Sequence, residues 1–269
     1  MSLPQEKIAV APAPVVLVGC GPGAADLLTL RALRAIESAD VLVYDNLIGD
    51  EILDFARPDA EKIYVGKRAA QHTLPQEEIN ALLVRLARAG KRTARLKGGD
   101  PFIFGRGGEE MDELRAAGIA VEVIPGVTAA AACAAAAGIP LTHREHARTL
   151  VLTTGHSKPG AQDPDWEALA RPGQTVAFYM GVRNAGEIER ELLAHGMPGE
   201  TKIAIIERGA TARQRIHAAT LATLTARIAA AAVKAPALLI VGEVAAYVGD
   251  GTDANSDSPA GSAKHTANE

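Results

Sequence analysis

The chain has 269 residues, of which 48% are hydrophobic and 22% charged, proportions that exclude a mainly disordered chain or a coiled coil. The net charge of −4 provides no global basic field for nucleic acid or an anionic membrane, so an anionic substrate must meet a local cluster of arginines. The two cysteines, Cys20 and Cys133, lie far apart, which indicates neither a disulfide framework nor a zinc site and fits a reducing cytoplasm.

No stretch of the sequence is suited to a membrane or to export. No run reaches the roughly 18 apolar residues that a spanning helix needs. Leu17-Val18-Gly19-Cys20 has the pattern of a lipoprotein cleavage site, but the segment before it contains Glu6, Pro12 and Pro14 and lacks an apolar core. We therefore expect a soluble cytoplasmic protein that binds neither membrane nor nucleic acid.

The first apolar elements predict a βαβ unit. Residues 15–18 are a continuous apolar run, typical of a buried parallel strand, and a glycine-rich turn follows. Apolar residues at helical spacing predict a helix over 27–36 with Asp26 as its N-cap. A strand over 41–44 then ends at Asp45.

This unit also satisfies a loose dinucleotide-binding pattern. Gly19-x-Gly21-x-x-Ala24 follows the strand, and Asp45 lies at about the distance expected of an acid that binds a ribose. Pro22 argues against this interpretation, because proline removes one of the backbone amides that would bind a pyrophosphate. A dehydrogenase stays open as an alternative.

The rest of the first half alternates between helices and strands. Lys67 and Arg68 follow a predicted strand at its carboxyl end, where ligands bind in open α/β sheets, so they are candidate anion contacts or simply solvated. The alanine-rich segment 129–137 predicts a helix that packs very close to its neighbour, with Cys133 in the core. The other predicted elements are helices over 48–55, 77–89 and 109–117 and strands over 62–65, 92–96 and 121–124.

The segment 96–110 is the densest in unusual residues. Five of its glycines lie within eleven residues, which frees the backbone and allows close approach to a ligand. Two of the four phenylalanines, Phe102 and Phe104, lie here, and Arg106 precedes Glu109 by three residues. A plain connection with a local ion pair is the alternative. Flat apolar surface beside a fixed cation favours a binding site.

The second half begins after a boundary predicted at 140–148. His143 and His146 lie three residues apart there, but no cysteine or carboxylate cluster completes a metal shell, so we expect a solvated linker and no metal. Strands are predicted over 149–154, 174–179, 203–206, 215–218 and 237–242, and helices over 166–170 and 185–195. The expected organisation is an N-terminal α/β domain over 15–139 and a C-terminal α/β domain over 149–249, with disordered segments over 1–14 and 250–269.

Together these motifs resemble the uroporphyrinogen-III C-methyltransferases, a branch of the S-adenosylmethionine-dependent tetrapyrrole methyltransferase superfamily. The resemblance spans about residues 15–248 and rests on the turn after Gly19, Tyr44-Asp45, Gly66-Lys67-Arg68, the run from Gly98 to Glu110, Pro125-Gly126-Val127-Thr128 and Tyr179-Met180-Gly181. The uninterrupted run from Gly98 to Glu110 with Lys67 indicates this branch. The chain lacks the dehydrogenase and ferrochelatase module of fused siroheme synthases and so resembles the stand-alone enzyme.

The resemblance implies two α/β domains of the tetrapyrrole methyltransferase type, in a homodimer, with S-adenosylmethionine in the interdomain cleft and S-adenosylhomocysteine as its product. It implies no metal. The residues that would line the cofactor pocket are Pro22, Gly98, Gly99, Asp100, Ile103, Thr128, Ala129, Met180 and Gly209. Asp100 would accept a hydrogen bond from the cofactor's ribose or ammonium group. Ile103 and Met180 would give apolar contact, with core packing as the alternative for Met180.

The implied reaction methylates C2 and C7 of uroporphyrinogen III to give precorrin-2, for siroheme, cobalamin or haem d1 biosynthesis. The substrate's pyrrole carbon attacks the sulfonium methyl directly, so catalysis is by alignment. A base must then remove a proton: Asp45 is the first candidate, with helix capping as its alternative role, and Glu109, held by Arg106, is the second. The candidates for pairing substrate carboxylates are Lys67 and Arg106, both also placed in catalysis, together with Arg144 and His156.

Three other functions stay open. A sibling methyltransferase would consume a later corrin precursor. A dinucleotide-dependent dehydrogenase would change nicotinamide fluorescence on binding and would not bind S-adenosylmethionine. A non-catalytic tetrapyrrole carrier would bind its ligand and turn nothing over.

Overall fold

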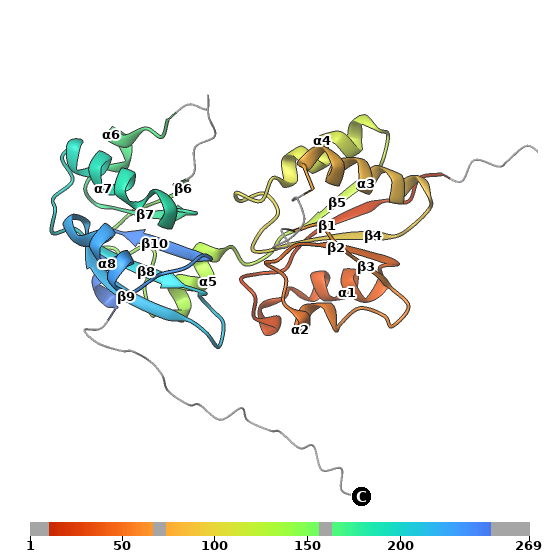
Figure 1. Cartoon of the computed structure of the whole chain (residues 1–269), viewed down its shortest axis with the longest axis horizontal. Helices are drawn as coiled ribbons and strands as arrows, with labels where there is room; N and C mark the ends of the chain where they lie inside the picture. Colours follow the sequence, from red (N-terminus) through yellow and green to blue (C-terminus); the bar gives the residue numbers. More distant parts are fainter. Residues whose placement is uncertain (1–10, 67–73, 156–162, 249–269) are drawn as a thin grey trace, which may run out of the picture.

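The computed structural model describes residues 11–66, 74–155 and 163–248. Their strands form two separate five-stranded sheets, each in its own lobe (Figure 1). None of the helices in these ranges is long and apolar enough to cross a bilayer. Of the predicted disordered ends, residues 1–10 and 250–269 lie outside the described residues. The chain folds as two α/β units, as the sequence predicts.

The first sheet is entirely parallel. Its strands are β1 (Val15–Gly19), β2 (Val41–Tyr44), β3 (Glu61–Tyr64), β4 (Thr93–Lys97) and β5 (Val121–Ile124), in the spatial order β3-β2-β4-β1-β5. Helices α1 (Leu30–Ser38) and α2 (Asp50–Leu53) cover one face, and α3 (Gln76–Arg88) and α4 (Gly107–Ala116) cover the other (Figure 1). Because both faces are covered, the neighbours Leu17 and Val18 are both fully buried, in opposite cores.

The second sheet is mixed. Its strands are β6 (Thr149–Thr154), β7 (Gln174–Tyr179), β8 (Lys202–Glu207), β9 (Arg215–Thr220) and β10 (Ala237–Val241), in the order β6-β7-β10-β8-β9. Strands β6 and β7 pair in parallel, and the other three pairs are antiparallel. Helices α6 (Trp166–Leu169), α7 (Ala185–Ala194) and α8 (Leu224–Ala230) pack on one face. The opposite face packs against α5 (Ala129–Ala136) and the 3-10 helix η4 (Glu243–Tyr247).

Helix α5 precedes the predicted domain boundary but packs against the second sheet. Ala130, Cys133 and Ala134 lie in one buried cluster with Ala204 and Ile206 of β8. The small side chains allow the close approach that the sequence predicts, and Cys133 is a core residue as expected. By its packing, α5 belongs to the second lobe, although it precedes residues 140–148 in the sequence. The predicted division around 140–148 therefore stays a proposal.

The N-cap prediction for the first helix is wrong. Asp26 lies in a short 3-10 turn, η1 (Ala25–Leu27), and Thr29 caps α1 by accepting a hydrogen bond from the Ala32 N–H at 3.1 Å. The threonine hydroxyl satisfies an amide of the first turn that has no partner within the helix, so α1 begins at Leu30. The sequence patterns also missed α8, η4 and the 3-10 helices η2 (Val182–Asn184) and η3 (Leu221–Thr223).

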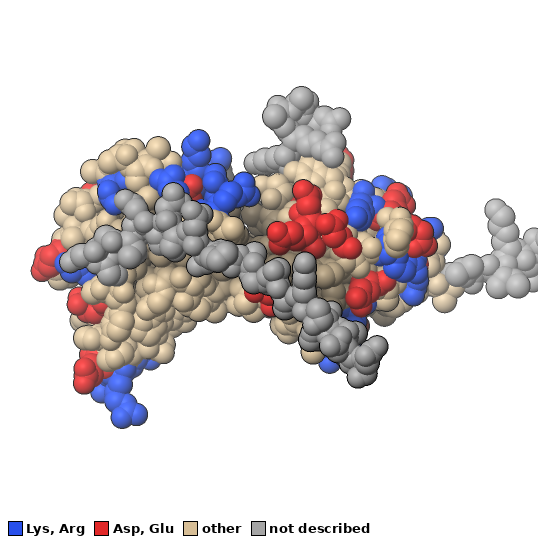
Figure 2. All heavy atoms as spheres, turned by 90° about the horizontal axis from the view of Figure 1, so that it is seen from below, with Lys and Arg blue, Asp and Glu red and all other residues tan. Residues whose placement is uncertain are grey.

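Charged side chains of both signs are interspersed on one face of the molecule (Figure 2). On the face shown in Figure 2, Lys and Arg form several small groups that alternate with acidic and uncharged surface. Among the described residues on that face there is no continuous basic stripe, which agrees with the net charge of −4.

Both cysteines are expected to be unreactive in the folded protein. Burial raises the pKa of Cys20 to about 12 and that of Cys133 to about 11. Since the thiolate is the reactive form, an aromatic disulfide reagent at about pH 8 should label neither cysteine in the native protein and both in denaturant. Rapid labelling of the native protein would contradict this expectation.

Candidate functional site

The segments that follow β1, β2 and β4 meet at one edge of the first sheet, because these strands are parallel and adjacent. Asp45 follows β2, residues 98–100 follow β4, and the glycine turn follows β1. Ligands of open α/β sheets bind beyond this carboxyl edge. The edge therefore forms the first side of the candidate site.

Backbone hydrogen bonds lock these segments together. The Gly99 N–H donates to the Gly21 carbonyl at 2.6 Å, and the Gly21 N–H donates back to the Gly99 carbonyl at 3.2 Å. The Asp100 carboxylate accepts from the N–H groups of Phe102 at 2.9 Å and Gly126 at 3.1 Å. A carboxylate has about four acceptor positions. Asp100 therefore holds its own loop and keeps capacity for the predicted cofactor contact.

This bonding argues against the dinucleotide alternative. The Gly21 amide is used by Gly99, and α1 begins only at Leu30, so the glycine turn does not lead directly into a helix. In a dinucleotide-binding sheet the first two strands are neighbours. Here β4 lies between β2 and β1. The sequence pattern is present without the fold that gives it that function.

Gly126 lies where three segments touch, and it has no room for a side chain. A Cβ there would collide with the Gly99 carbonyl oxygen and with the backbone of Gly19. We expect Gly126→Ala to lower the free energy of unfolding by about 1–3 kcal/mol, the usual cost of overpacking. Urea unfolding measures this change.

Gly108→Ala in α4 is the matched control, because an added Cβ there meets no atom within 4 Å. It should leave stability unchanged or raise it by about 0.4–1 kcal/mol. Equal unfolding midpoints for the two variants would contradict the close contact at Gly126.

Residues with left-handed backbone cluster beside this edge. Phe104, Arg106 and Met180 have φ values of 51°, 59° and 55°. Such values are uncommon for residues with a side chain and concentrate at functional sites. Phe104 and Met180 are also 39% and 51% exposed. The apolar side chains of Phe104 and Met180 are therefore available for contact with a ligand.

The two lobes meet at Tyr179. Its hydroxyl lies 2.6 Å from the Thr128 hydroxyl and accepts from the Ala130 N–H at 3.0 Å, and its ring centroid lies 4.8 Å from that of Phe104. The loop after β4, the start of α5 and the end of β7 thus form one junction. The predicted cofactor residues in these three segments are Gly98, Gly99, Asp100, Ile103, Thr128, Ala129 and Met180.

The two remaining predicted cofactor residues approach the same junction. A Cβ on Gly209 would collide with the Cys133 sulfur in α5. A Cβ on Gly23 would lie 3.3 Å from the Thr211 methyl group, so the turn that contains Pro22 comes close to the segment after Gly209. Residues far apart in sequence therefore approach one another at this junction.

Asp45 does not cap the helix that follows it. Its Oδ1 accepts from the Leu47 N–H at 3.0 Å, and its Oδ2 lies 3.3 Å from Nη2 of Arg95. Helix α2 has Gly49 as its N-cap, so the capping alternative is wrong. The Asp45 side chain is 24% exposed, which leaves it accessible to a substrate.

The predicted pair of Arg106 and Glu109 is present and bidentate. Nε lies 2.8 Å from Oε1 and Nη2 lies 2.6 Å from Oε2. The hydrogen bonds to Glu109 raise the pKa of Arg106. The two side chains are 43% and 49% exposed. The pair with Glu109 uses Nε and Nη2, which leaves Nη1 and the second hydrogen of Nη2 for a substrate carboxylate.

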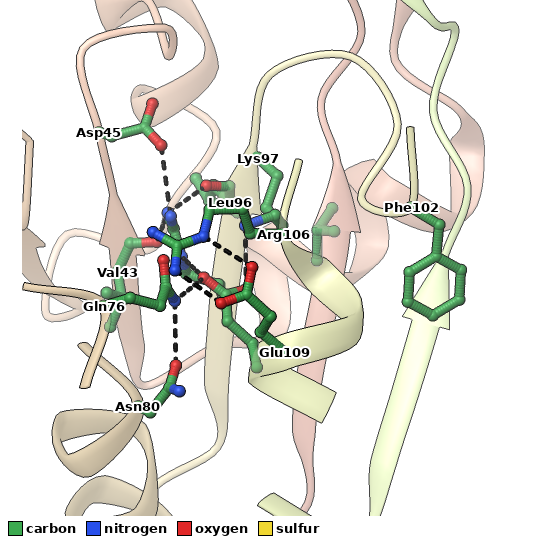
Figure 3. Close-up of polar contacts among 12 residues, drawn as sticks. Val43, Asp45, Gln76, Asn80, Leu96, Lys97, Phe102, Arg106 and Glu109 are labelled. Atoms are coloured by element: carbon green, nitrogen blue, oxygen red, sulfur yellow. Dashed lines mark hydrogen bonds and ion pairs between the residues drawn. The ribbon is translucent and has the colours of Figure 1, made fainter. Parts of the chain in front are cut away.

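A group of buried charges that no sequence pattern predicted lies next to Asp45 (Figure 3). Arg95 and Lys97 of β4 and Glu110 of α4 form what we call the buried charge cluster. Glu110 is fully buried and lies 3.1 Å from Arg95 Nε and 3.0 Å from Lys97 Nζ. The available signal was the spacing of the two basic residues, because positions i and i+2 of a strand point to one face.

The other predicted substrate contacts lie elsewhere or outside the described residues. Arg144 lines a pocket of about 510 Å³ in the segment between the two sheets. The other lining residues are Thr142, His143, Ala147 and Arg148. Lys67 and His156 fall outside the described residues, so their roles stay predictions.

A carboxylate does accompany the two linker histidines, contrary to the sequence prediction. One ligand atom each from His143, Glu145 and His146 lie within 4.8 Å of one another. The histidine rings stack with centroids 4.6 Å apart, and the Glu145 N–H donates to His143 Nδ1 at 3.2 Å. The expectation that this segment holds no metal stays a prediction.

Comparisons with known proteins point to one family. Residues 14–225 match the sequence model of the tetrapyrrole (corrin/porphyrin) methylases. The chain is 56% identical over 230 residues to a siroheme synthase of Stutzerimonas stutzeri, an alignment that covers 86% of this chain and 50% of that protein. The chain thus spans about half the length of the curated relatives it matches.

Solved structures agree with this match. The uroporphyrin-III C-methyl transferase of Thermus thermophilus, complexed with S-adenosyl homocysteine, superposes with a TM-score of 0.74 at 40% identity, covering 86% of this chain and 93% of that one. A cobalt precorrin-4 methyltransferase of cobalamin biosynthesis superposes with a TM-score of 0.77 at 25% identity, covering 86% and 95%. The predicted fold class is confirmed.

Proposed function

Because the chain belongs to the tetrapyrrole methylase family, we propose that it transfers methyl groups from S-adenosylmethionine to C2 and C7 of uroporphyrinogen III, forming precorrin-2. The chain is a methyltransferase by family. The choice of uroporphyrinogen III is supported by the 40% identity with the Thermus thermophilus enzyme, compared with 25% for the precorrin-4 enzyme. The unbroken run from Gly98 to Glu110 supports it as well.

The observation that carries the proposal is the junction of the two lobes. Three segments that are distant in sequence are held there by the Tyr179 hydroxyl and the Asp100 carboxylate. Exposed Phe104 and Met180 lie beside these polar groups. S-adenosylmethionine has an apolar adenine face and polar ribose and amino acid groups, so this mixture of surfaces fits it.

The residues of the junction act by alignment. S-adenosylmethionine supplies a methyl group on a positively charged sulfur, which an electron-rich pyrrole carbon can attack directly. The protein must hold carbon, methyl and sulfur nearly in line, and the locked loops around Gly99 and Gly126 are rigid enough for that task. The interlocked backbone is therefore part of the proposed mechanism.

Asp45 is the base that we propose for removing a proton from the methylated tetrapyrrole. The methylated carbon is fully substituted and has no hydrogen, so the proton leaves from another position of the ring system as its neutral charge is restored. Asp45 lies at the carboxyl edge of the first sheet, both its oxygens accept hydrogen bonds, and its side chain remains partly exposed. Glu109 is the second candidate, but both its oxygens already bond to Arg106. A carboxylate that is not engaged in a bidentate pair is better placed to accept a proton.

Arg106 is proposed to bind a carboxylate of the substrate. Its pair with Glu109 leaves Nη1 and one hydrogen of Nη2 free to donate, and it lies in the loop between β4 and α4. Arg144 is proposed to bind another carboxylate from the pocket beside the linker. Lys67 and His156 remain proposed contacts on the resemblance alone.

We also propose that the enzyme is a cytoplasmic homodimer without a metal. Two buried, unpaired thiols fit a reducing compartment. The product would enter siroheme, cobalamin or haem d1 biosynthesis.

The test is anaerobic incubation of the purified protein with uroporphyrinogen III and radiolabelled S-adenosylmethionine, counting methyl groups per tetrapyrrole. Two methyl groups would support the proposal. If the cofactor binds and no label moves, uroporphyrinogen III is the wrong acceptor, and the same assay with later corrin precursors tests the sibling reaction. Tetrapyrrole binding without transfer to any of these acceptors would favour a carrier.

A further inference from the structure

The buried charge cluster is an unusual feature of the first lobe. The side chains of Arg95, Lys97 and Glu110 are 5%, 5% and 0% exposed. Buried charges are costly unless they are paired and hydrogen-bonded. Here Glu110 uses both oxygens for the two basic groups. One carboxylate between two cations leaves one positive charge to be matched.

Asp45 supplies the matching charge. Its Oδ2 accepts from Nη2 of Arg95 at 3.3 Å, so the cluster extends from beneath α4 to the carboxyl end of β2 (Figure 3). The Asp45 side chain is 24% exposed, whereas the three residues of the buried charge cluster are buried. The cluster thus has one end that a substrate can reach.

Arg95 cannot move freely within the cluster. Its Nη1 donates to the backbone carbonyls of Leu96 at 2.7 Å and Val43 at 3.4 Å, and its Nε donates to Glu110 at 3.1 Å. Glu110 is in turn held by Gln76, whose Nε2 donates to it at 3.3 Å. Only Nη2 of the planar guanidinium points to Asp45, so the position of that nitrogen is set by the buried bonds.

We propose that Arg95, held by Glu110, is a positioning residue that fixes the direction of the Asp45 carboxylate for proton removal. The Leu47 N–H holds one oxygen of Asp45 and Arg95 holds the other, so the plane of the carboxylate is defined. A group held by buried partners needs no reorientation during the reaction. This inference rests on the proposed methyl transfer and on Asp45 as its base.

The test is a double-mutant cycle on single-turnover methyl transfer, with Arg95→Lys, Asp45→Asn and the double variant. Lysine keeps the positive charge but loses the planar fork that bonds Glu110 and Asp45 together. Arg95→Lys should slow transfer by about 10²-fold, the size of effect that misplacing a reacting group by about 1 Å can cause. Cofactor affinity should stay unchanged. In the Asp45→Asn background the same substitution should change the rate less than about threefold, since it acts through Asp45.

The matched control lies at the other end of the same strand. Arg92, just before β4, makes a bidentate pair with Asp40, just before β2, at 3.1 and 2.7 Å. Arg92→Lys removes the same kind of link between the same two strands away from the site. It should leave the transfer rate unchanged. If Arg95→Lys does not fold, Glu110→Gln replaces it in the cycle, because it keeps the shape of Glu110 and removes its charge.

The outcomes separate the two proposals. Equal slowing by Arg95→Lys in both backgrounds, or equal slowing by Arg92→Lys, would show a merely structural role and overturn this inference while the proposed function stands. Absence of methyl transfer by the wild-type protein would overturn the proposed function and this inference with it. If Arg95→Lys slows transfer only when Asp45 is intact, and Arg92→Lys does not slow it, both the proposed function and the positioning role of Arg95 are supported.

Discussion

Methyl transfer to uroporphyrinogen III is expected to slow by about 10²–10⁴-fold when Asp45 is replaced by asparagine, the usual contribution of a positioned base. Asparagine keeps an oxygen that can accept from the Leu47 N–H, so the turn after β2 should persist. The loss should therefore fall on kcat, with the cofactor dissociation constant unchanged. Single-turnover transfer and calorimetric cofactor binding measure the two quantities.

Glu109→Gln is the comparison that decides between the two candidate bases. It removes the bidentate partner of Arg106 and leaves Asp45 intact. If Asp45 is the base, Glu109→Gln should change kcat by less than about tenfold. A larger loss in Glu109→Gln than in Asp45→Asn would assign the proton transfer to Glu109 instead.

Arg106→Ala is expected to lower kcat/KM for the tetrapyrrole by about 10–100-fold through a higher KM. A bidentate pair between a guanidinium and a carboxylate is among the stronger polar contacts, and its loss on the substrate side cannot be replaced by water alone. The melting temperature should hardly change, because exposed ion pairs contribute little to stability. Steady-state kinetics with varied uroporphyrinogen III measure the effect.

Arg190→Ala is the matched control for this variant. Arg190 makes the same type of exposed contact with Glu191, at 2.7 Å, on helix α7 of the other lobe. Its removal should leave kcat and KM unchanged. Equal losses of kcat/KM in the two variants would show that Arg106 does not bind the substrate.

The sequence predicted most of the regular elements because their signals are local. The apolar run of β1 and the helical spacing of α3 and α7 depend only on neighbouring residues, and these elements lie where they were expected. The first helix began later than expected, because Thr29 lies close enough to cap its amides and Asp26 does not. Helix α8 was missed because three of its seven residues are alanines and only Leu224 and Ile228 are large and apolar, too few to form a clear apolar stripe.

The sequence predicted which residue types would form the candidate site, but not the long-range contacts that hold them in place. The loop from Gly98 to Arg106 stands out by its glycines and aromatic residues, and the pair of Arg106 and Glu109 follows from their spacing. Tyr179 was predicted as the end of a strand and as part of the Tyr179-Met180-Gly181 motif, with no role of its own in the site. Its contact with Thr128 joins residues 51 positions apart, and no local pattern signals such a contact.

Residue types and short spacings by themselves determined that this protein is a two-part α/β chain with a glycine-rich loop after β4, which we expect to bind a ligand. They could do so because helix and strand periodicity, glycine freedom and ion pairing at i and i+3 are local properties. The tertiary structure alone decided that α5 packs on the second sheet and that β4 separates β1 from β2. It also decided that Arg95 reaches Asp45, a pair 50 residues apart. The whole core sets burial and strand order. The sequence alone therefore does not indicate which residue pairs with a charged side chain inside a strand.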